Sequence, residues 1–465
     1  MVKLYNTLSR RKDDLVPLTA SEVRMYVCGV TVYDFSHIGH ARSALVFDVL
    51  RRYLRFKGYR VTFVRNYTDV DDRIIRRANE AGVAATEISE RYIAAEREDM
   101  ASLRILPPDA EPKATEHVPE MIALIERLIA GGVAYEVGGD VYFEIRRFPP
   151  YGKLSGKNLD ELLAGARVEV DERKRDPRDF ALWKAAKPGE PSWKSPWGPG
   201  RPGWHIECSA MAMRYLGESF DVHGGGEDLI FPHHECEIAQ SEAATGQPFA
   251  RYWVHNGFVN MGKEKMSKSL GNTLLIRELV KRHDADAIRL FFLGTHYRNP
   301  VEWAEERVQD SARAMERFTR LLADPLALAS ATMAGNATRY ARFRAQFEAA
   351  MDDDLNTPQA LGVLFELARA LYDDRERAAT DPDASAAFAA GVAELRALSA
   401  ALGLFDRRDG PSGPPPEVER LVAERAAARA RRDFRRSDEL RAEIAGLGWA
   451  VEDTSAGPRL TRKDG

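Results

Sequence analysis

The sequence has few cysteines and lacks long hydrophobic runs. Its 465 residues include only three cysteines, Cys28, Cys208 and Cys236, which are too few and too scattered for a disulfide framework. No apolar run is long enough to cross a bilayer, and the charged first segment, residues 1–15, lacks the apolar centre of a secretory signal. These absences argue against a disulfide-rich secreted domain and against a membrane partner. They favour a protein of the reducing cytoplasm.

The sequence also lacks a strong excess of one charge. It has 67 Lys and Arg residues against 71 Asp and Glu residues, which gives a net charge of −4 at pH 7. A nucleic-acid binder of this composition needs local basic surfaces, because the net charge provides no general attraction to phosphate. The chain has 44% hydrophobic and 30% charged residues, as a globular protein does. Its length suggests about two to four domains.

The phosphate-loop pattern G-x-x-x-x-G-K-[ST] is absent, and the run Gly224-Gly225-Gly226 does not fit G-x-G-x-x-G. Two other short strings stand out instead. They are His37-Ile38-Gly39-His40 and Lys265-Met266-Ser267-Lys268-Ser269. A pair of histidines and a pair of lysines, each at a loop, can hold a triphosphate from two sides. This pairing points to nucleotide activation of a substrate.

The histidine string lies where a strand is expected to turn into a helix. Apolar residues nearly alternate over residues 23–30, whereas an apolar stripe of helical period runs over 38–59, and 60–67 resembles a second strand. This β-α-β pattern predicts a parallel sheet with a right-handed crossover. Backbone N–H groups and the helix dipole favour phosphate at such a helix start, and Gly39 permits close approach. Alternatively, His37 and His40 are ordinary polar residues of a helix cap.

The lysine string lies in a loop rich in glycine and lysine. Lys263, Lys265 and Lys268 are crowded between Gly262 and Gly271. Mobile ammonium groups can follow the negative charge that builds up during phosphoryl or nucleotidyl transfer. The alternative is a charged surface loop with no ligand. Together with the histidine string, this loop favours phosphate binding.

The two strings resemble the signature motifs of class I aminoacyl-tRNA synthetases, and the surrounding stretches resemble the cysteinyl-tRNA synthetase family. The matching stretches are residues 26–34 (YVCGVTVYD), 67–72 (YTDVDD), 203–211 (GWHIECSAM) and 231–235 (FPHHE). The resemblance covers nearly the whole chain. It implies an α/β fold in which a parallel-sheet, Rossmann-like catalytic domain with an insertion is followed by an α-helical bundle and a small C-terminal domain.

The patterns and the resemblance together predict the domain boundaries. The expected parts are a catalytic domain at 1–260 with an insertion at about 116–200, a connective region with the lysine loop at 261–305, a helical-bundle tRNA-binding domain at 306–405, a Pro/Gly linker at 406–416 and an anticodon-binding domain at 417–465. The last part carries an arginine cluster, Arg425, Arg429, Arg431, Arg432, Arg435 and Arg436. Such a run is either a solvated helix face or an RNA contact, and the resemblance favours the anticodon.

Four residues far apart in the sequence form a candidate metal site. Cys28 and Cys208 lie inside the matching stretches, and His233 and Glu237 follow Pro232 at a spacing that places both on one face of a helix start. Two thiolates, an imidazole and a carboxylate suit a tetrahedral Zn²⁺ ion. Alternatively, the cysteines are buried hydrophobic residues and the histidine is a polar residue at a helix start.

Spacing alone does not select the ligands, because His234 could replace His233 and Cys236 could replace Glu237. Family members often carry Asn where this chain has Cys236. The resemblance implies one Zn²⁺ per chain, held by Cys28, Cys208, His233 and Glu237. Zinc would provide selectivity for cysteine. Packing discriminates poorly between amino acids as close in size as cysteine and serine, whereas a metal that binds sulfur binds the cysteine thiolate.

The resemblance also implies the reaction and its participants. ATP and L-cysteine would form cysteinyl-adenylate, with Mg²⁺ accompanying ATP, and the cysteinyl group would pass to the 3′ end of tRNA(Cys). His37, His40, Lys265 and Lys268 would stabilise the transition state, and His37, Gly39, His40 and Lys268 would bind ATP. Thr68, Trp204, His223 and Asp228 would line the amino-acid and adenosine pocket, although core or helix-cap roles suit them too. A monomer is expected.

Two other functions fit parts of the sequence. A cysteine ligase that acts on an amino-sugar acceptor, as in mycothiol synthesis, shares the fold and both signatures, but it lacks a full tRNA-binding C-terminal part. Residues 417–465 therefore favour tRNA. A catalytically silent RNA-binding relative is the alternative from a different class, and the intact signatures and four metal candidates argue against it.

Overall fold

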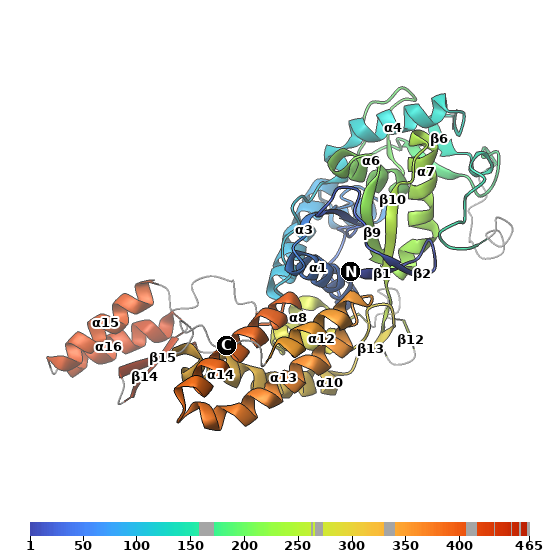
Figure 1. Ribbon diagram of the computed structural model, residues 1–465. Helices are drawn as coiled ribbons and strands as arrows, with labels where there is room; N and C mark the ends of the chain where they lie inside the picture. The colour runs from blue at the N-terminus through green and yellow to red at the C-terminus, as the bar shows by residue number, and fades with distance from the viewer. Residues whose placement is uncertain are drawn as a thin grey trace. The chain divides into compact units, whose positions relative to one another are not determined.

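The computed structural model describes residues 1–157, 172–261, 264–265, 273–329, 340–405, 416–431, 433–447, 449–454 and 457–462. The chain divides into two compact units, Met1–Phe405 and Asp406–Gly465 (Figure 1). No helix within the described ranges combines the length and the apolar composition that crossing a membrane requires.

A four-stranded parallel sheet forms the centre of the first unit. Its strands, in spatial order, are β10 (Ala250–Asn256), β9 (Phe220–Gly226), β3 (Glu22–Val27) and β4 (Arg60–Arg65). The strand order reverses direction at β3, because the next strand along the chain, β4, lies on one side of it and β9 lies on the other. Ligands bind at the carboxyl ends of the strands beside such a switch point. The parallel sheet predicted from the sequence is confirmed.

Helices cover both faces of this sheet because alternate side chains of each strand point to opposite faces. Met25 and Val27 of β3 belong to the apolar cluster that includes helix α1 (Ile38–Phe56), whereas Tyr26 belongs to the cluster that includes α6 (Trp204–Leu216). Each large apolar side chain buried in this way contributes roughly 1.5–3 kcal/mol relative to an exposed one. The central sheet is therefore held from both sides.

Helix α1 begins where the histidine string predicts it, but β3 ends earlier than the predicted strand. The strand ends at Val27, and a loop leads from Cys28 to His37, the N-cap of α1. Gly29 packs directly on the backbone of Asn66, where a side chain at position 29 would put its Cβ 1.6 Å from the carbonyl oxygen. This close approach brings the loop after β3 against the loop after β4.

The remaining elements of the N-terminal half of the chain surround the sheet. They are β1 (Lys3–Asn6), β2 (Arg11–Asp14), α2 (Asp72–Ala81), α3 (Ala85–Ser102), η1 (Ala114–Glu116), α4 (Val118–Ala130), η2 (Ile145–Arg147), η3 (Glu227–Leu229), η4 (Ile230–His234) and α7 (Glu235–Thr245). An antiparallel sheet, β5 (Ala134–Val137), β6 (Asp140–Phe143), β7 (Phe180–Ala185) and β8 (Gly200–Pro202), forms within and at the end of the predicted insertion.

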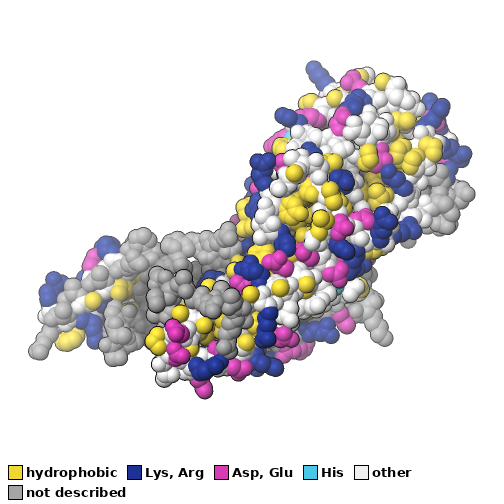
Figure 2. Space-filling view, viewed as in Figure 1, with side chains coloured by type: hydrophobic (Ala, Val, Ile, Leu, Met, Phe, Trp, Pro, Cys, Tyr) yellow, Lys and Arg dark blue, Asp and Glu magenta, His cyan; other side chains and the backbone are white. Residues whose placement is uncertain are grey.

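A small sheet and a helical region complete the first unit. The sheet joins β12 (Glu264–Lys265), β11 (Val259–Met261) and β13 (Val301–Glu302). The helices that follow along the chain are α8 (Ile276–Leu279), α9 (Ala285–Leu293), α10 (Glu305–Leu322), α11 (Pro325–Ala329), α12 (Ala341–Asp352), α13 (Thr357–Ala378) and α14 (Pro382–Ala401). On the face shown in Figure 2, Lys and Arg side chains alternate with Asp and Glu over this unit.

The second unit contains α15 (Pro416–Ala430), α16 (Phe434–Gly446) and the antiparallel pair β14 (Trp449–Thr454) and β15 (Gly457–Arg462). Its small core includes Val418, Leu440 and Ile444. The predicted arginine cluster does not form one surface, because Arg425 is only 2% exposed. Its exposed members among the described residues are Arg429, Arg431 and Arg435. Arg435 and the half-exposed Arg436 pair with glutamates, and Arg432 lies outside the described residues.

Candidate active site and metal centre

A cavity of about 740 Å³ opens at the carboxyl ends of the parallel strands. The loop after β3, the start of α1, and the ends of β9 and β10 all contribute to its lining. Cys28, Gly29, His37, Gly39, His40, Gly226, Asp228, Asn256 and Gly257 are among the lining residues. The cavity therefore lies at the switch point of the sheet, where an α/β protein of this topology binds its ligand.

The two histidines of the first string cap helix α1 and stack on each other. The Nδ1 atom of His37 accepts a hydrogen bond from the Gly39 N–H at 3.1 Å, and Nδ1 of His40 accepts from the His37 N–H at 3.2 Å. Their ring centroids are 3.8 Å apart. Because Nδ1 is the acceptor in both rings, a neutral imidazole carries its proton on Nε2, which is then a hydrogen-bond donor.

The start of α1 suits an anion. The helix is 19 residues long and has no acidic residue in its first turn, so the positive end of its dipole is not offset locally. His37, Gly39 and His40 all line the cavity. Two imidazole donors at a helix N-terminus form an arrangement that can bind phosphate oxygens.

The lysine string follows, a few residues along the chain, the segment that forms another wall of this cavity. Phe258 and Val259 line the cavity, and Val259 begins β11, which pairs with β12. Lys265 is the last residue of β12, and Lys268 lies outside the described residues.

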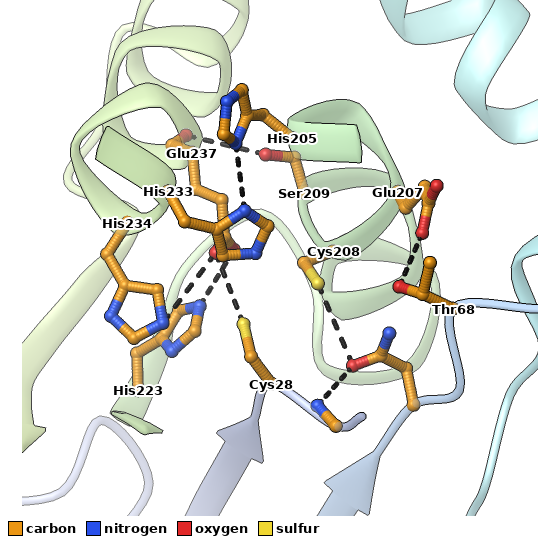
Figure 3. A network of polar contacts seen from close by, with 12 residues as sticks. Cys28, Thr68, His205, Glu207, Cys208, Ser209, His223, His233, His234 and Glu237 are labelled. Carbon is orange, nitrogen blue, oxygen red and sulfur yellow. Dashed lines mark hydrogen bonds and ion pairs between the residues drawn. The ribbon is translucent and has the colours of Figure 1, made fainter. Parts of the chain in front are cut away.

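The four predicted metal ligands come together beside the cavity. Cys28 follows β3, Cys208 lies on α6, His233 lies in η4 and Glu237 lies in the first turn of α7. Their ligand atoms all lie within 4.8 Å of one another. The carboxylate of Glu237 is 3.2 Å from the Cys28 Sγ and 3.1 Å from the His233 Nε2 (Figure 3). This group is a candidate metal site built from four separate segments.

The charges in this group favour a cation at its centre. Burial raises the pKa of Cys28 well above its ordinary value, and its hydrogen bond with Cys208 and the nearby Glu237 carboxylate raise it further. Burial also raises the pKa of Cys208. Burial opposes the ionisation of Glu237, but the imidazoles of His223 and His233 outweigh it and lower its pKa. A divalent cation would relieve the repulsion among these anion-forming groups.

The donor set and its spacing fit a tetrahedral metal. Typical zinc bonds of about 2.0–2.3 Å place neighbouring donors roughly 3.3–3.8 Å apart, which is compatible with the upper limit of 4.8 Å found here. Burial lowers the pKa of His233 to about 3, so its imidazole is neutral, as a metal ligand must be. The His233 Nδ1 lies 2.8 Å from Nδ1 of His205, a contact that fixes the ring orientation.

Both histidines that spacing left open, His233 and His234, lie in a group of potential metal donors. A second group of potential donors, Cys28, His223, His234 and Glu237, shares two members with the first. In it, the Nε2 of His234 is 3.9 Å from the Glu237 carboxylate, whereas Nδ1 of His234 is 2.8 Å from His255. Cys236 belongs to neither group among the described residues.

The four predicted substrate-binding residues divide into two pairs. Trp204 and Asp228 line the cavity, and the Trp204 indole stacks on His233 with a centroid separation of 4.3 Å. Thr68 and His223 are buried instead. The Thr68 hydroxyl donates to Glu207 at 2.7 Å, and the His223 Nε2 lies 2.8 Å from Glu237. The structure thus places the second pair behind the residues that line the cavity.

Asn66 was missed by the sequence reasoning. Its Oδ1 accepts from the Gly29 N–H at 2.9 Å and lies 3.7 Å from the Cys208 Sγ, so it connects the loop that carries the Cys28 thiol with the helix that carries the Cys208 thiol. The residue directly follows β4, and a polar residue at the carboxyl end of a parallel strand is a signal that could have identified it.

Comparison with known families gives three matches along the chain. Residues 14–313 match the model of the tRNA synthetases class I (C) catalytic domain. Residues 346–406 match the DALR domain, and residues 412–457 match the cysteinyl-tRNA ligase anticodon binding domain. The first match alone covers more than half of the chain.

Curated relatives match over the full length. The chain is 53% identical to a cysteine–tRNA ligase of Geobacter sulfurreducens, with 98% of each chain covered. It is 52% identical to one of Alkalilimnicola ehrlichii, with 100% of each chain covered.

Solved structures show the same fold at low identity. A methionyl-tRNA synthetase of Mycobacterium tuberculosis in complex with methionyl-adenylate matches with a TM-score of 0.59 and 16% identity, over 82% of this chain and 89% of that one. A LeuRS–tRNA–LeuAMS ternary complex from Agrobacterium radiobacter matches with a TM-score of 0.62 and 13% identity, over 84% and 86% of the two chains. The predicted fold class is confirmed.

Proposed function

The chain belongs to the cysteine–tRNA ligases, which are class I aminoacyl-tRNA synthetases, and we propose that its cavity activates L-cysteine with ATP for transfer to tRNA(Cys). One observation carries the assignment of the site. Cys28 both lines the cavity and belongs to the candidate metal group, so a metal held there faces the same space as the histidine pair. The residues that would bind the thiol of an amino acid are therefore adjacent to the histidines that would bind the phosphate chain of a nucleotide.

The first step is an attack of the cysteine carboxylate oxygen on the α-phosphorus of ATP. A bond forms between that oxygen and phosphorus, and the bond to the pyrophosphate oxygen breaks, which leaves cysteinyl-adenylate and pyrophosphate. The Nε2–H donors of His37 and His40 stabilise the charge that develops on the phosphate oxygens from the helix side. Lys265 and Lys268 supply positive charge from the other signature, and Mg²⁺ accompanies ATP.

In the second step, a hydroxyl of the 3′-terminal adenosine of tRNA attacks the carbonyl carbon of the adenylate, and AMP leaves. Trp204 and Asp228 line the cavity in which both steps take place. Thr68 and His223 act from behind the cavity wall, Thr68 through its hydrogen bond to Glu207 and His223 through its contact with Glu237.

Cys28, Cys208, His233 and Glu237 would hold a Zn²⁺ ion. The soft donors favour zinc over the hard cations Mg²⁺ and Ca²⁺. Bound zinc would accept the substrate sulfur as a thiolate, which a serine hydroxyl cannot supply at neutral pH. The residues around the ion would orient its ligands, as the His205–His233 contact does for one imidazole.

Cysteine-dependent exchange of pyrophosphate into ATP tests the activation half of this function. We expect exchange with L-cysteine and at least about a hundredfold less with serine, alanine or valine, because these lack a thiol. Absence of exchange with cysteine in folded, zinc-containing protein would refute the assignment.

The amino-sugar ligase is not favoured, because residues 412–457 match an anticodon-binding domain. We propose that the enzyme acts in the cytoplasm. The three cysteines are all free, as a reducing compartment permits. The monomer expected from the sequence stays a prediction.

A further inference from the structure

Arg42 lies on α1, two residues beyond the histidine string, and is only 1% exposed. Its guanidinium donates to backbone carbonyls from two segments far along the chain. Nη1 donates to the Phe258 carbonyl at 2.5 Å, and Nη2 donates to that of Tyr297 at 3.3 Å and to that of Asn299. One planar guanidinium group on helix α1 therefore binds two backbone segments at once.

These two segments meet directly. The Gly257 N–H donates to the Tyr297 carbonyl at 2.9 Å, and the Phe258 carbonyl accepts from the Val301 N–H at 2.9 Å. A Cβ at position 257 would lie 2.7 Å from the Arg298 carbonyl oxygen, so only glycine permits this approach. The contact continues into the pairing of β11 with β13. We call this contact, between residues 257–258 and 297–301, the joint. Strands β11 and β13 begin at the joint, and Arg42 binds it.

The far side of the joint is anchored independently of α1. Asp354, buried in the loop between α12 and α13, accepts hydrogen bonds from the Tyr297 hydroxyl at 2.6 Å and from Nε of Arg298 at 2.8 Å. It also accepts from the Tyr5 N–H of strand β1 at 2.7 Å. Because the helical region and β1 hold the joint from that side, Arg42 provides the connection from α1.

This connection determines the separation between two walls of the active-site cavity. Gly257, Phe258 and Val259 line the cavity, as do His37 and His40. A shift of the joint relative to α1 would change the separation between these walls. Burial lowers the pKa of Arg42 to about 10, so the guanidinium keeps its charge at neutral pH.

We propose that Arg42 is a positioning residue, which fixes the Gly257–Val259 wall against the histidine pair and so sets the geometry in which ATP is held for attack. The proposal rests on the proposed function, because ATP is the substrate that the two walls hold. A lysine at this position would keep the charge, but its single ammonium group cannot match the fork that holds both segments.

The test compares Arg42→Lys with Arg289→Lys in pyrophosphate exchange. Arg289 serves as the control, because it is also fully buried and donates to the backbone carbonyls of Leu103 and Leu402 and to the buried Asp48 carboxylate, none of which lines the cavity. We expect Arg42→Lys to lose about 10²-fold in kcat/KM for ATP, as a misplacement of about 1 Å does. The KM for cysteine and the zinc content should stay within about twofold of the unmodified protein, because the metal group lies on other segments.

Arg289→Lys should lower the melting temperature without changing the KM for ATP. Equal ATP kinetics in the two folded variants would overturn the role of Arg42. The proposed function fails separately, if the unmodified protein shows no cysteine-dependent exchange.

Hydrogen exchange on the unmodified protein provides a second measurement that does not depend on whether Arg42→Lys folds. We expect ATP to slow amide exchange at Gly257, Val301 and Trp303 together with the start of α1, because Arg42 couples them. The first two amides donate across the joint and the third donates to the Asn260 carbonyl. Protection confined to the start of α1 would contradict the proposal.

Discussion

The Cys236 sulfur lies 3.2 Å from the hydroxyl of Tyr151, in a buried contact outside the candidate metal group. Burial raises the pKa of this thiol above its ordinary value, so it stays protonated at neutral pH. The cysteine that sequence spacing left as an alternative ligand is therefore held by a different part of the fold.

The first prediction concerns the ligand set. We expect one tightly bound Zn²⁺ per chain, retained in Cys236→Asn and lost in Glu237→Gln, because only the second change removes a donor from the group. Metal analysis after dialysis gives the stoichiometry. Loss of zinc from a folded Cys236→Asn protein, or active unmodified protein without stoichiometric zinc, would contradict the ligand set.

A second prediction concerns the loop that carries Cys28. In Gly29→Ala, the new Cβ would lie 1.6 Å from the Asn66 carbonyl oxygen, so the loop must move and carry the Cys28 thiol with it. We expect weaker zinc binding, by about 10- to 100-fold, measured by competition with a chelator. Gly362→Ala is the control, since a Cβ there meets nothing within 4 Å and zinc binding should not change. Unchanged zinc affinity in Gly29→Ala would show that the loop adapts.

The sequence predicted those parts of the fold that depend on periodicity. The change from alternation to helical period correctly predicted β3, α1 and β4, because side-chain burial in these elements follows directly from backbone geometry. The length of the loop between Val27 and His37 was not predicted. It depends on a contact between Gly29 and Asn66, and a contact between residues 37 positions apart leaves no local pattern.

The site was predicted less completely than the fold. The residue types of a candidate metal site were recognisable, but neighbouring positions on one helix start do not reveal the direction of each side chain, and His233 and His234 both lie in a group of potential donors. Thr68 and His223 were assigned to the pocket, although the structure buries both behind it. Arg42 was not recognised because its partners are backbone carbonyls more than 200 residues away, and carbonyls carry no sequence signal.

A third prediction separates catalysis from binding. His40→Ala and Lys268→Ala should each lower the rate of adenylate formation by about 10²- to 10³-fold, because each removes a donor to the phosphate charge of the transition state. Cysteine binding should change little, since the candidate metal group consists of Cys28, Cys208, His233 and Glu237.

Pre-steady-state adenylate formation and equilibrium binding of cysteine measure the two effects separately. His117→Ala is the matched control, because His117 bonds to Lys113 and Tyr215 and does not line the cavity. A normal activation rate in Lys268→Ala would show that the lysine loop is only a charged surface.

A fourth prediction concerns the exposed arginines of the second unit. The triple variant Arg429→Gln, Arg431→Gln, Arg435→Gln should raise the KM for tRNA while leaving cysteine-dependent exchange intact, because exchange does not involve tRNA. Charging should also depend less steeply on salt, by about 0.7–0.9 in the logarithmic slope for each phosphate that an arginine no longer neutralises.

The control for this prediction neutralises exposed arginines of the first unit, Arg11, Arg60 and Arg127. If both triple variants have the tRNA kinetics of the unmodified protein, the arginines are a solvated surface and not an RNA contact.

Charging of total tRNA with radiolabelled cysteine tests the central claim most directly. The account predicts that the purified protein, given ATP, Mg²⁺ and cysteine, transfers label to the tRNA fraction that accepts cysteine, and that serine is not transferred. Activation of cysteine without any transfer to tRNA, with the label passing instead to an amino-sugar acceptor, would contradict it.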